Sequence, residues 1–139
     1  MSSMETLKLS GDGQVLVEGI HDSVLEGISR SSSGRVSLIF RSAAGARIEI
    51  ATADAANAVV WAEGPVMPVI VARLTVRSSA DIRSVLAKTL DSDALRRYEI
   101  SQLGQVPAEW CLVVEPAVGG TVVVSGSGRG ASDVTVRTT

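Results

Sequence analysis

The sequence has very few of the residues that most often carry catalysis, metal binding or covalent cross-links. Cys111 is the only cysteine and His21 is the only histidine among the 139 residues. A single cysteine cannot form an intrachain disulfide, and neither residue lies in a Cys/His cluster with the spacing of a metal site. We therefore expect no metal and no cofactor, and we expect the chain to reside in the reducing cytoplasm.

Aromatic residues, basic charge and long apolar runs are also scarce. Aromatic residues make up 3% of the chain, so few rings are available for stacking on bases or sugars, and the formal net charge is −2. The longest apolar stretch, Val66–Ala72, is broken by Pro68 and is far shorter than the ~20 residues that span a bilayer. Met1–Leu9 lacks the apolar segment of a signal peptide. We expect a cytoplasmic protein that binds neither nucleic acid nor membrane.

The chain is nevertheless apolar enough to fold around a core. Hydrophobic residues make up 45% and charged residues 20%, a balance that excludes an intrinsically disordered chain. The length is close to the commonest size of one domain, and the sequence contains neither an internal repeat nor a long linker. We therefore predict a single domain over residues 1–139.

The hydrophobic pattern predicts strands before and after a short helical region. Period-two alternation and turn residues predict an α+β fold with an antiparallel sheet of about six to eight strands and one or two short helices. In one strand, Ile70, Ala72, Leu74 and Val76 share a face, and Val71 lies among the outward residues. The expected strands are Val24–Ile28, Val36–Phe40, Ile48–Ile50, Ala58–Ala62, Val69–Arg77, Trp110–Glu115, Thr121–Ser125 and Ser132–Arg137; the expected helices are Ile82–Leu90, after a capping box at Ser78–Asp81, and Ala94–Ile100.

A β-hairpin gives the sharpest local prediction. Placing every large apolar side chain of its two strands on one face pairs Phe40 with Ile48 and Leu38 with Ile50. That register leaves a three-residue loop, 43–45, whose last residue is Gly45. Such loops commonly end in a residue with positive φ, which glycine adopts without steric strain. The turn residues and the side-chain pattern therefore agree.

The same register predicts a partner-binding site on the outward face of the hairpin. Arg41 falls opposite Arg47, and like charges that face each other mildly destabilise a sheet. Glu49 lies diagonally from Arg41 and is expected to neutralise the pair. The alternative is that both guanidinium groups receive an acidic partner. We take Arg41, Arg47 and Glu49 as the candidate partner-binding residues.

Other candidate sites have simpler interpretations. His21 and Asp22 form the only pair that could start a catalytic dyad, but they fit a turn at the entry of a strand. The Gly126–Gly130 segment follows a strand without opening a helix, as a phosphate-binding loop would, and is interpreted as a hairpin loop. Asp91–Asp93 is expected to cap a helix, and Cys111 to be a small core residue. We therefore predict no catalytic residue and no enzyme.

The segment Gly19–Ile28, followed by the hairpin, resembles the opening of small uncharacterised bacterial proteins. In these proteins a His-Asp-x-x-Leu-x-Gly strand, matched here by His21–Gly27, precedes a β-hairpin whose turn carries a glycine. The resemblance covers about a third of the chain. It implies a bacterial, intracellular and non-enzymatic protein, and it transfers no catalytic residue.

These observations favour a non-catalytic protein-binding module of a bacterial cell. A toxin-neutralising immunity-type protein is one concrete form, since that class is small, cytosolic and mildly acidic. The expected partner is another protein with an acidic surface, and a homo-oligomer is compatible with the sequence. Two alternatives stay open: a structural subunit of a phage-derived particle, and a small hydrolase or ligand-binding protein that uses His21.

Overall fold

A computed structural model describes residues 5–52, 59–63, 69–78, 82–103, 110–126 and 134–139. Within these ranges the chain forms nine β-strands in one antiparallel sheet, with two α-helices between the sixth and seventh strands. The predicted α+β class with a mainly antiparallel sheet is thereby confirmed. The elements are β1 (Glu5–Thr6), β2 (Val24–Arg30), β3 (Val36–Arg41), β4 (Arg47–Thr52), β5 (Val59–Glu63), β6 (Val69–Ser78), α1 (Ile82–Thr89), α2 (Ser92–Leu103), β7 (Trp110–Val118), β8 (Thr121–Gly126) and β9 (Val134–Thr138).

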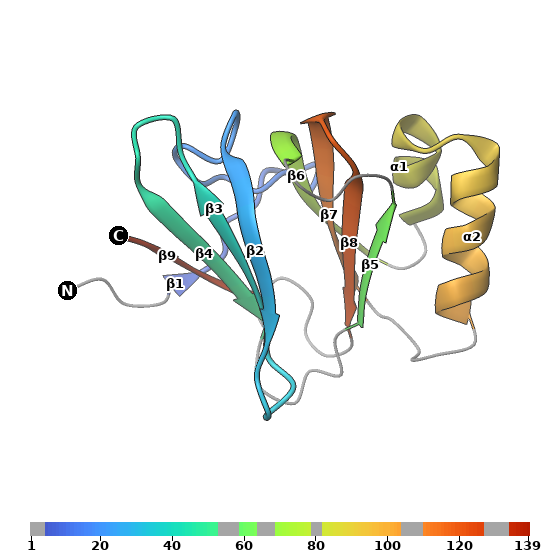
Figure 1. Ribbon diagram of the computed structural model, residues 1–139, viewed down its shortest axis with the longest axis horizontal. Coiled ribbons are helices and arrows are strands. Elements are labelled where there is room, and N and C mark those ends of the chain that lie inside the picture. Colours follow the sequence, from blue (N-terminus) through green and yellow to red (C-terminus); the bar gives the residue numbers. More distant parts are fainter. Residues whose placement is uncertain (1–4, 53–58, 64–68, 79–81, 104–109, 127–133) are drawn as a thin grey trace.

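The sheet divides into two halves that face each other. Its strand order is β1-β9-β4-β3-β2-β6-β7-β8-β5. We call β1, β9, β4, β3 and β2 the open half, and β6, β7, β8 and β5 the covered half. Only two residue pairs, Val24 with Ile70 and Leu25 with Val69, join β2 to β6. Beyond this short joint the two halves separate into the two strand layers seen in Figure 1.

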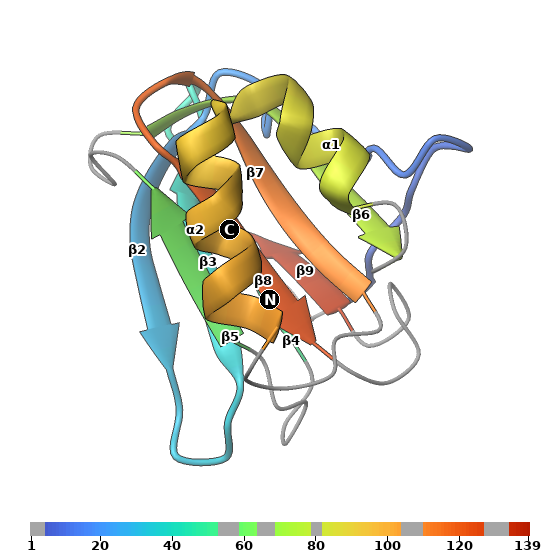
Figure 2. The same ribbon diagram turned by 90° about the vertical axis from the view of Figure 1, so that its right-hand side faces the viewer.

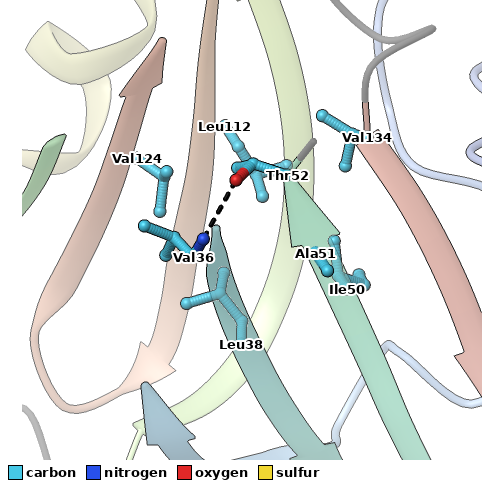
Figure 3. A pocket seen from close by; sticks show the side chains of 8 residues that line it. All are labelled: Val36, Leu38, Ile50, Ala51, Thr52, Leu112, Val124 and Val134. Carbon is cyan, nitrogen blue, oxygen red and sulfur yellow. Dashed lines mark hydrogen bonds between the residues drawn. The ribbon is translucent and has the colours of Figure 1, made fainter. Parts of the chain in front are cut away.

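The main hydrophobic core lies between these two layers. Val36, Leu38 and Ile50 of the open half line the same narrow space as Leu112 and Val124 of the covered half (Figure 3). This space is too small to hold a water molecule. The inward faces are therefore closely packed, as protein interiors generally are. At one end of the core, the Val36 N–H donates to Oγ1 of Thr52 at 3.0 Å.

A second, smaller core lies between the covered half and the helices. Its buried residues come from both helices and from the outward faces of β7 and β8, and Trp61 of β5 packs edge-on against Tyr98 with ring centroids 5.2 Å apart. Figure 2 shows both helices lying over this half of the sheet. Strands β7 and β8 are consequently buried on both faces. The buried members are Leu86, Tyr98, Cys111, Val113 and Val123.

The predicted hairpin is confirmed in register and in turn geometry. Phe40 pairs with Ile48 and Leu38 with Ile50, and all four side chains are buried. The loop closes with the Gly45 N–H donating to the Ser42 carbonyl, and Gly45 has φ +91°. Arg47 is half-buried on the opposite face from these core residues.

The predicted faces of β6 are wrong over its first half. Val69 and Val71 are fully buried, whereas Ile70 and Ala72 are only partly buried. The register shifts between Val71 and Arg73, so Ala72 is the extra residue of a β-bulge. A bulge exchanges the two faces of a strand beyond it, because strand side chains alternate with period two. Simple alternation holds only after the bulge, where Leu74 and Val76 point into the core.

Several other predictions are confirmed or lie outside the described residues. Each expected strand and helix is present with its bounds shifted by a few residues, and the two-residue β1 is an addition. The Asp91–Asp93 segment caps α2, since Oδ1 of Asp91 accepts the Ala94 N–H at 2.8 Å. Residues 79–81 of the expected capping box and residues 127–130 of the glycine-rich loop lie outside the described ranges.

Candidate functional site

No helix of the described residues covers the outward face of the open half (Figure 1), and this face carries several charged side chains. The pairing register sets them in rows across the strands. One row places Arg41 of β3 opposite Arg47 of β4. The next row runs through Glu49 of β4, which lies opposite Arg137 of β9. The structure therefore brings the predicted residues Arg41, Arg47 and Glu49 onto one surface and adds Arg137 to them.

Arg41 is paired with Glu26 instead of the predicted Glu49. Its Nε lies 3.3 Å from Oε1 of Glu26, and its Nη1 donates to the Gly45 carbonyl oxygen at 2.9 Å. Glu26 is an extra residue of β2, because the pairing of β2 with β3 shifts between Leu25 and Gly27. The neighbouring strand thus supplies the neutralising carboxylate. Alternation alone gave no signal for it, since a bulge is not visible in the hydrophobic pattern.

Glu49 is held by two arginines. Its Oε1 lies 2.6 Å from Nη2 of Arg137 and 3.6 Å from Nη1 of Arg47, and its side chain is only 13% exposed. Burial raises the pKa of Glu49, but the hydrogen bond and charge of Arg137, together with Ser37 and Arg47, outweigh burial and hold the pKa below its ordinary value. The carboxylate is therefore ionised and fixed at neutral pH.

We call Glu26, Arg41, Arg47, Glu49 and Arg137 the arginine face. Its three guanidinium groups outnumber its two carboxylates, and the three arginine side chains are 45%, 40% and 37% exposed. Nε of Arg137 is buried without a hydrogen-bond partner among the described residues. Because guanidinium groups bind carboxylates in a planar, two-point geometry, this face suits an acidic ligand better than a neutral one.

Sequence reasoning missed Arg137 because its position depends on which strand lies next to β4. The last strand could have paired at several edges of the sheet. The signal available was weak: Val134 and Val136 alternate with Thr135 and Arg137, which marks Arg137 as an outward residue and leaves its neighbours undefined.

His21 supports the backbone at the joint between the two halves. Its Nδ1 lies 2.7 Å from the Ala72 carbonyl oxygen, which is the carbonyl of the β6 bulge. A carbonyl oxygen only accepts, so Nδ1 must carry the proton. Nε2 lies 3.6 Å from Oδ1 of Asp22, and both side chains are largely exposed, at 72% and 66%. Asp22 adopts φ +64°, the turn conformation that Asp tolerates better than most residues.

Cys111 is buried in the second core, as predicted. Its Sγ lies 3.5 Å from Oγ of Ser125 and 3.7 Å from the hydroxyl of Tyr98. Burial raises the pKa of the Cys111 thiol above its ordinary value, and burial likewise raises the pKa of Tyr98. A neutral, enclosed thiol is a poor nucleophile, so these three groups are packing and hydrogen-bonding residues.

The described residues contain no cluster of three or more His, Cys, Asp or Glu side chains that could hold a metal ion. Among the described helices, none has the length and apolar character needed to cross a membrane.

Comparison with known proteins identifies no relative of this chain. No family model matches the chain, and neither a curated protein nor a solved structure matches it.

Proposed function

We propose that this chain is a non-catalytic protein-binding domain of the bacterial cytoplasm that receives an acidic protein surface on its arginine face. A toxin-neutralising immunity-type protein is the most concrete form of this function. The observation that carries the proposal is the facing pair of Arg41 and Arg47, joined by Arg137, on a sheet surface that neither described helix covers.

The arrangement of charges supports an acidic partner. Arg41 and Arg47 are neighbours across two strands, where like charges are unfavourable in the free protein. Each arginine contacts a different glutamate, Glu26 or Glu49, and the face still has one positive charge in excess. A carboxylate placed between the two guanidinium groups would relieve their repulsion. Arginine is also among the residues enriched at protein interfaces.

A pair of double charge reversals tests the proposal. Arg41→Glu with Arg47→Glu reverses the face, whereas Arg96→Glu with Arg97→Glu makes the same change in net charge on exposed positions of α2. Tagged wild-type protein is used to isolate partners from the source cell, and an identified partner is then purified for calorimetry. We expect the first variant to lose more than about tenfold in affinity, because like charges across an interface repel, and the second to bind normally.

Salt dependence and self-association complete the test. The affinity of the wild-type protein should fall as salt is added, since exposed charges are screened beyond about 8 Å at physiological ionic strength. Full affinity of the Arg41/Arg47 variant for the purified partner would refute the proposal. Sedimentation that shows only copies of this chain associating with one another would favour a particle-forming subunit instead.

A further inference from the structure

An apolar strip lies beside the arginines on the same outward surface. We define the apolar strip as Val24, Gly27, Ile39 and Ile70. Gly27 pairs with Ile39, and Val24 pairs with Arg41 on one side and with Ile70 on the other. All four residues are partly exposed. Val118, which pairs with Ile70, extends this row and is 53% exposed.

Gly27 leaves its cross-strand partner Ile39 without a neighbouring side chain at that position of β2. Glycine weakens a strand, so it often marks a positive φ, a β-bulge or a close approach of other atoms. Gly45 has a positive φ, and a Cβ on Gly126 would lie 2.5 Å from the Trp110 ring. Gly27 has no positive φ and directly follows the bulge residue Glu26, and a Cβ built on it would meet no atom of the described residues within 4 Å. The space above Gly27 and beside Ile39 is therefore open within the described part of the chain, and we call this space the notch.

We propose, on the basis of the function proposed above, that the acidic partner seats a large apolar side chain in the notch over Gly27 and against Ile39. Carboxylates flanking that side chain then meet Arg41 and Arg47. This arrangement has the usual anatomy of an interface, with an apolar anchor at the centre and charged groups around it. The occupant is thus a segment of a protein that alternates acidic and large apolar residues.

The spacing of the strand defines the geometry of this segment. Ile39 and Arg41 are two residues apart on β3 and point outward together, so their side chains lie roughly 7 Å apart along the strand. An extended partner segment has the same period. Its apolar side chain and its nearest useful carboxylate therefore belong at positions i and i+2.

The charge of the chain favours an acidic protein segment over a nucleic acid as the occupant. The chain has a net charge of −2, and a nucleic acid carries a negative charge at every phosphate, whereas a short acidic segment brings only a few carboxylates. A peptide carboxylate needs only one or two guanidinium groups, and the face supplies three. The apolar strip adds contact area that a phosphate backbone would not use.

A short synthetic peptide tests the inference directly. The probe is the capped pentapeptide Glu-Ser-Trp-Ser-Glu, whose tryptophan and glutamates share one face when it is extended. Two matched peptides replace the tryptophan by alanine or both glutamates by lysine. Titrations to millimolar concentration are followed by amide chemical shifts of ¹⁵N-labelled protein. We expect shifts at Gly27, Ile39 and Arg41 with the probe, and much weaker shifts with either control peptide.

Gly27→Val provides the decisive variant. Valine fills open space in a strand, so the melting temperature should stay the same or rise, while the affinity for the probe should fall at least tenfold. Equal affinity for the tryptophan and alanine peptides, or chemical-shift changes confined to other surfaces, would overturn the proposed role of the apolar strip. This holds whatever affinity the Gly27→Val variant shows. Binding that survives Gly27→Val but is lost on reversal of Arg41 and Arg47 would overturn this inference and leave the proposed function intact. Binding that survives both changes would overturn both.

Discussion

The two halves of the sheet use their outward faces in opposite ways. In the covered half, Cys111 and Val113 of β7 point toward the helices and are as buried as Leu112 and Val114, which point toward the main core. In the open half, the strand β3 alternates between buried Leu38 and Phe40 and partly exposed Ser37 and Ile39. One continuous sheet therefore contains a doubly buried region and a singly buried region.

The amino-acid composition of the strands reflects this difference. A strand buried on both faces reads as a continuous apolar run, whereas a strand with one solvated face alternates. Residues 110–114 are apolar throughout, whereas β3 carries polar residues at two of its three outward positions, Ser37 and Arg41, with Ile39 between them. The outward side chains of the open half are consequently the ones available to a partner, and those of the covered half contribute to stability.

The substitution with the largest expected effect on stability weakens the packing of the helices against the covered half. Leu86→Ala removes a fully buried side chain of α1 and leaves a cavity, so we expect a loss of about 2–5 kcal/mol in the free energy of unfolding. Ile100→Ala on α2 is the control, because Ile100 is 68% exposed and should change stability by less than about 0.5 kcal/mol. Chemical denaturation measures both. Similar small values for the two variants would mean that the helices stabilise the sheet little.

The same kind of polar substitution on each outward face should give smaller losses of stability that differ between the two halves. Val113→Thr introduces a hydroxyl where no water reaches, and we expect a loss of about 1–3 kcal/mol. Ile39→Thr introduces the same group on the open face, where it is partly hydrated, and we expect less than about 1 kcal/mol. Thermal unfolding of the two variants checks the difference. A reversed order would show that the open face is covered in solution.

The smallest expected difference concerns pH. The pKa of Cys111 lies above its ordinary value of 9.0, so its contribution to stability is complete below that value and is lost as pH rises through the folded pKa. The pKa of Glu49 lies below its ordinary value of 4.5, so its contribution is complete above that value and is lost as pH falls through the folded pKa. The covered half should weaken in alkali and the open half in acid.

Two variants test the acid and the alkaline declines in stability separately. Cys111→Ala should reduce the alkaline decline in melting temperature, to which the raised pKa of Tyr98 also contributes, and leave the acid decline unchanged. Glu49→Gln should flatten the acid decline and leave the alkaline one unchanged. Each variant is the control for the other. If the melting temperature of Glu49→Gln declined in acid as it does in the wild-type protein, Arg137 and Arg47 would not hold the carboxylate in solution.

Local sequence pattern accounted for the elements and for part of the candidate site. The alternation of Leu38 and Phe40 with Ile48 and Ile50 predicted the hairpin register, and that register alone placed Arg41 opposite Arg47. The reason is that the pairing of two adjacent strands depends on a short turn and on side chains a few residues apart, all of which are encoded locally.

The partners of those arginines depended on strands far away in the sequence. Arg137 reaches Glu49 because β9 pairs with β4, and Glu26 reaches Arg41 because β2 carries a bulge. The bulge at Ala72, whose carbonyl accepts from His21, exchanged the expected faces of β6. Such irregularities preserve the composition of a strand while changing its phase, so the hydrophobic pattern does not reveal them.

The sequence by itself determined the α+β class, the helices, the hairpin register and the scarcity of groups suited to catalysis. Each of these follows from side-chain chemistry read over a few neighbouring residues. Only the tertiary structure decided the order of the nine strands, the bend at the joint of β2 and β6, and the half of the sheet that the helices cover. Strand order is a choice among many pairings with similar backbone hydrogen bonds. Packing of the whole core selects one of them, and with it the surface on which Arg41, Arg47 and Arg137 meet.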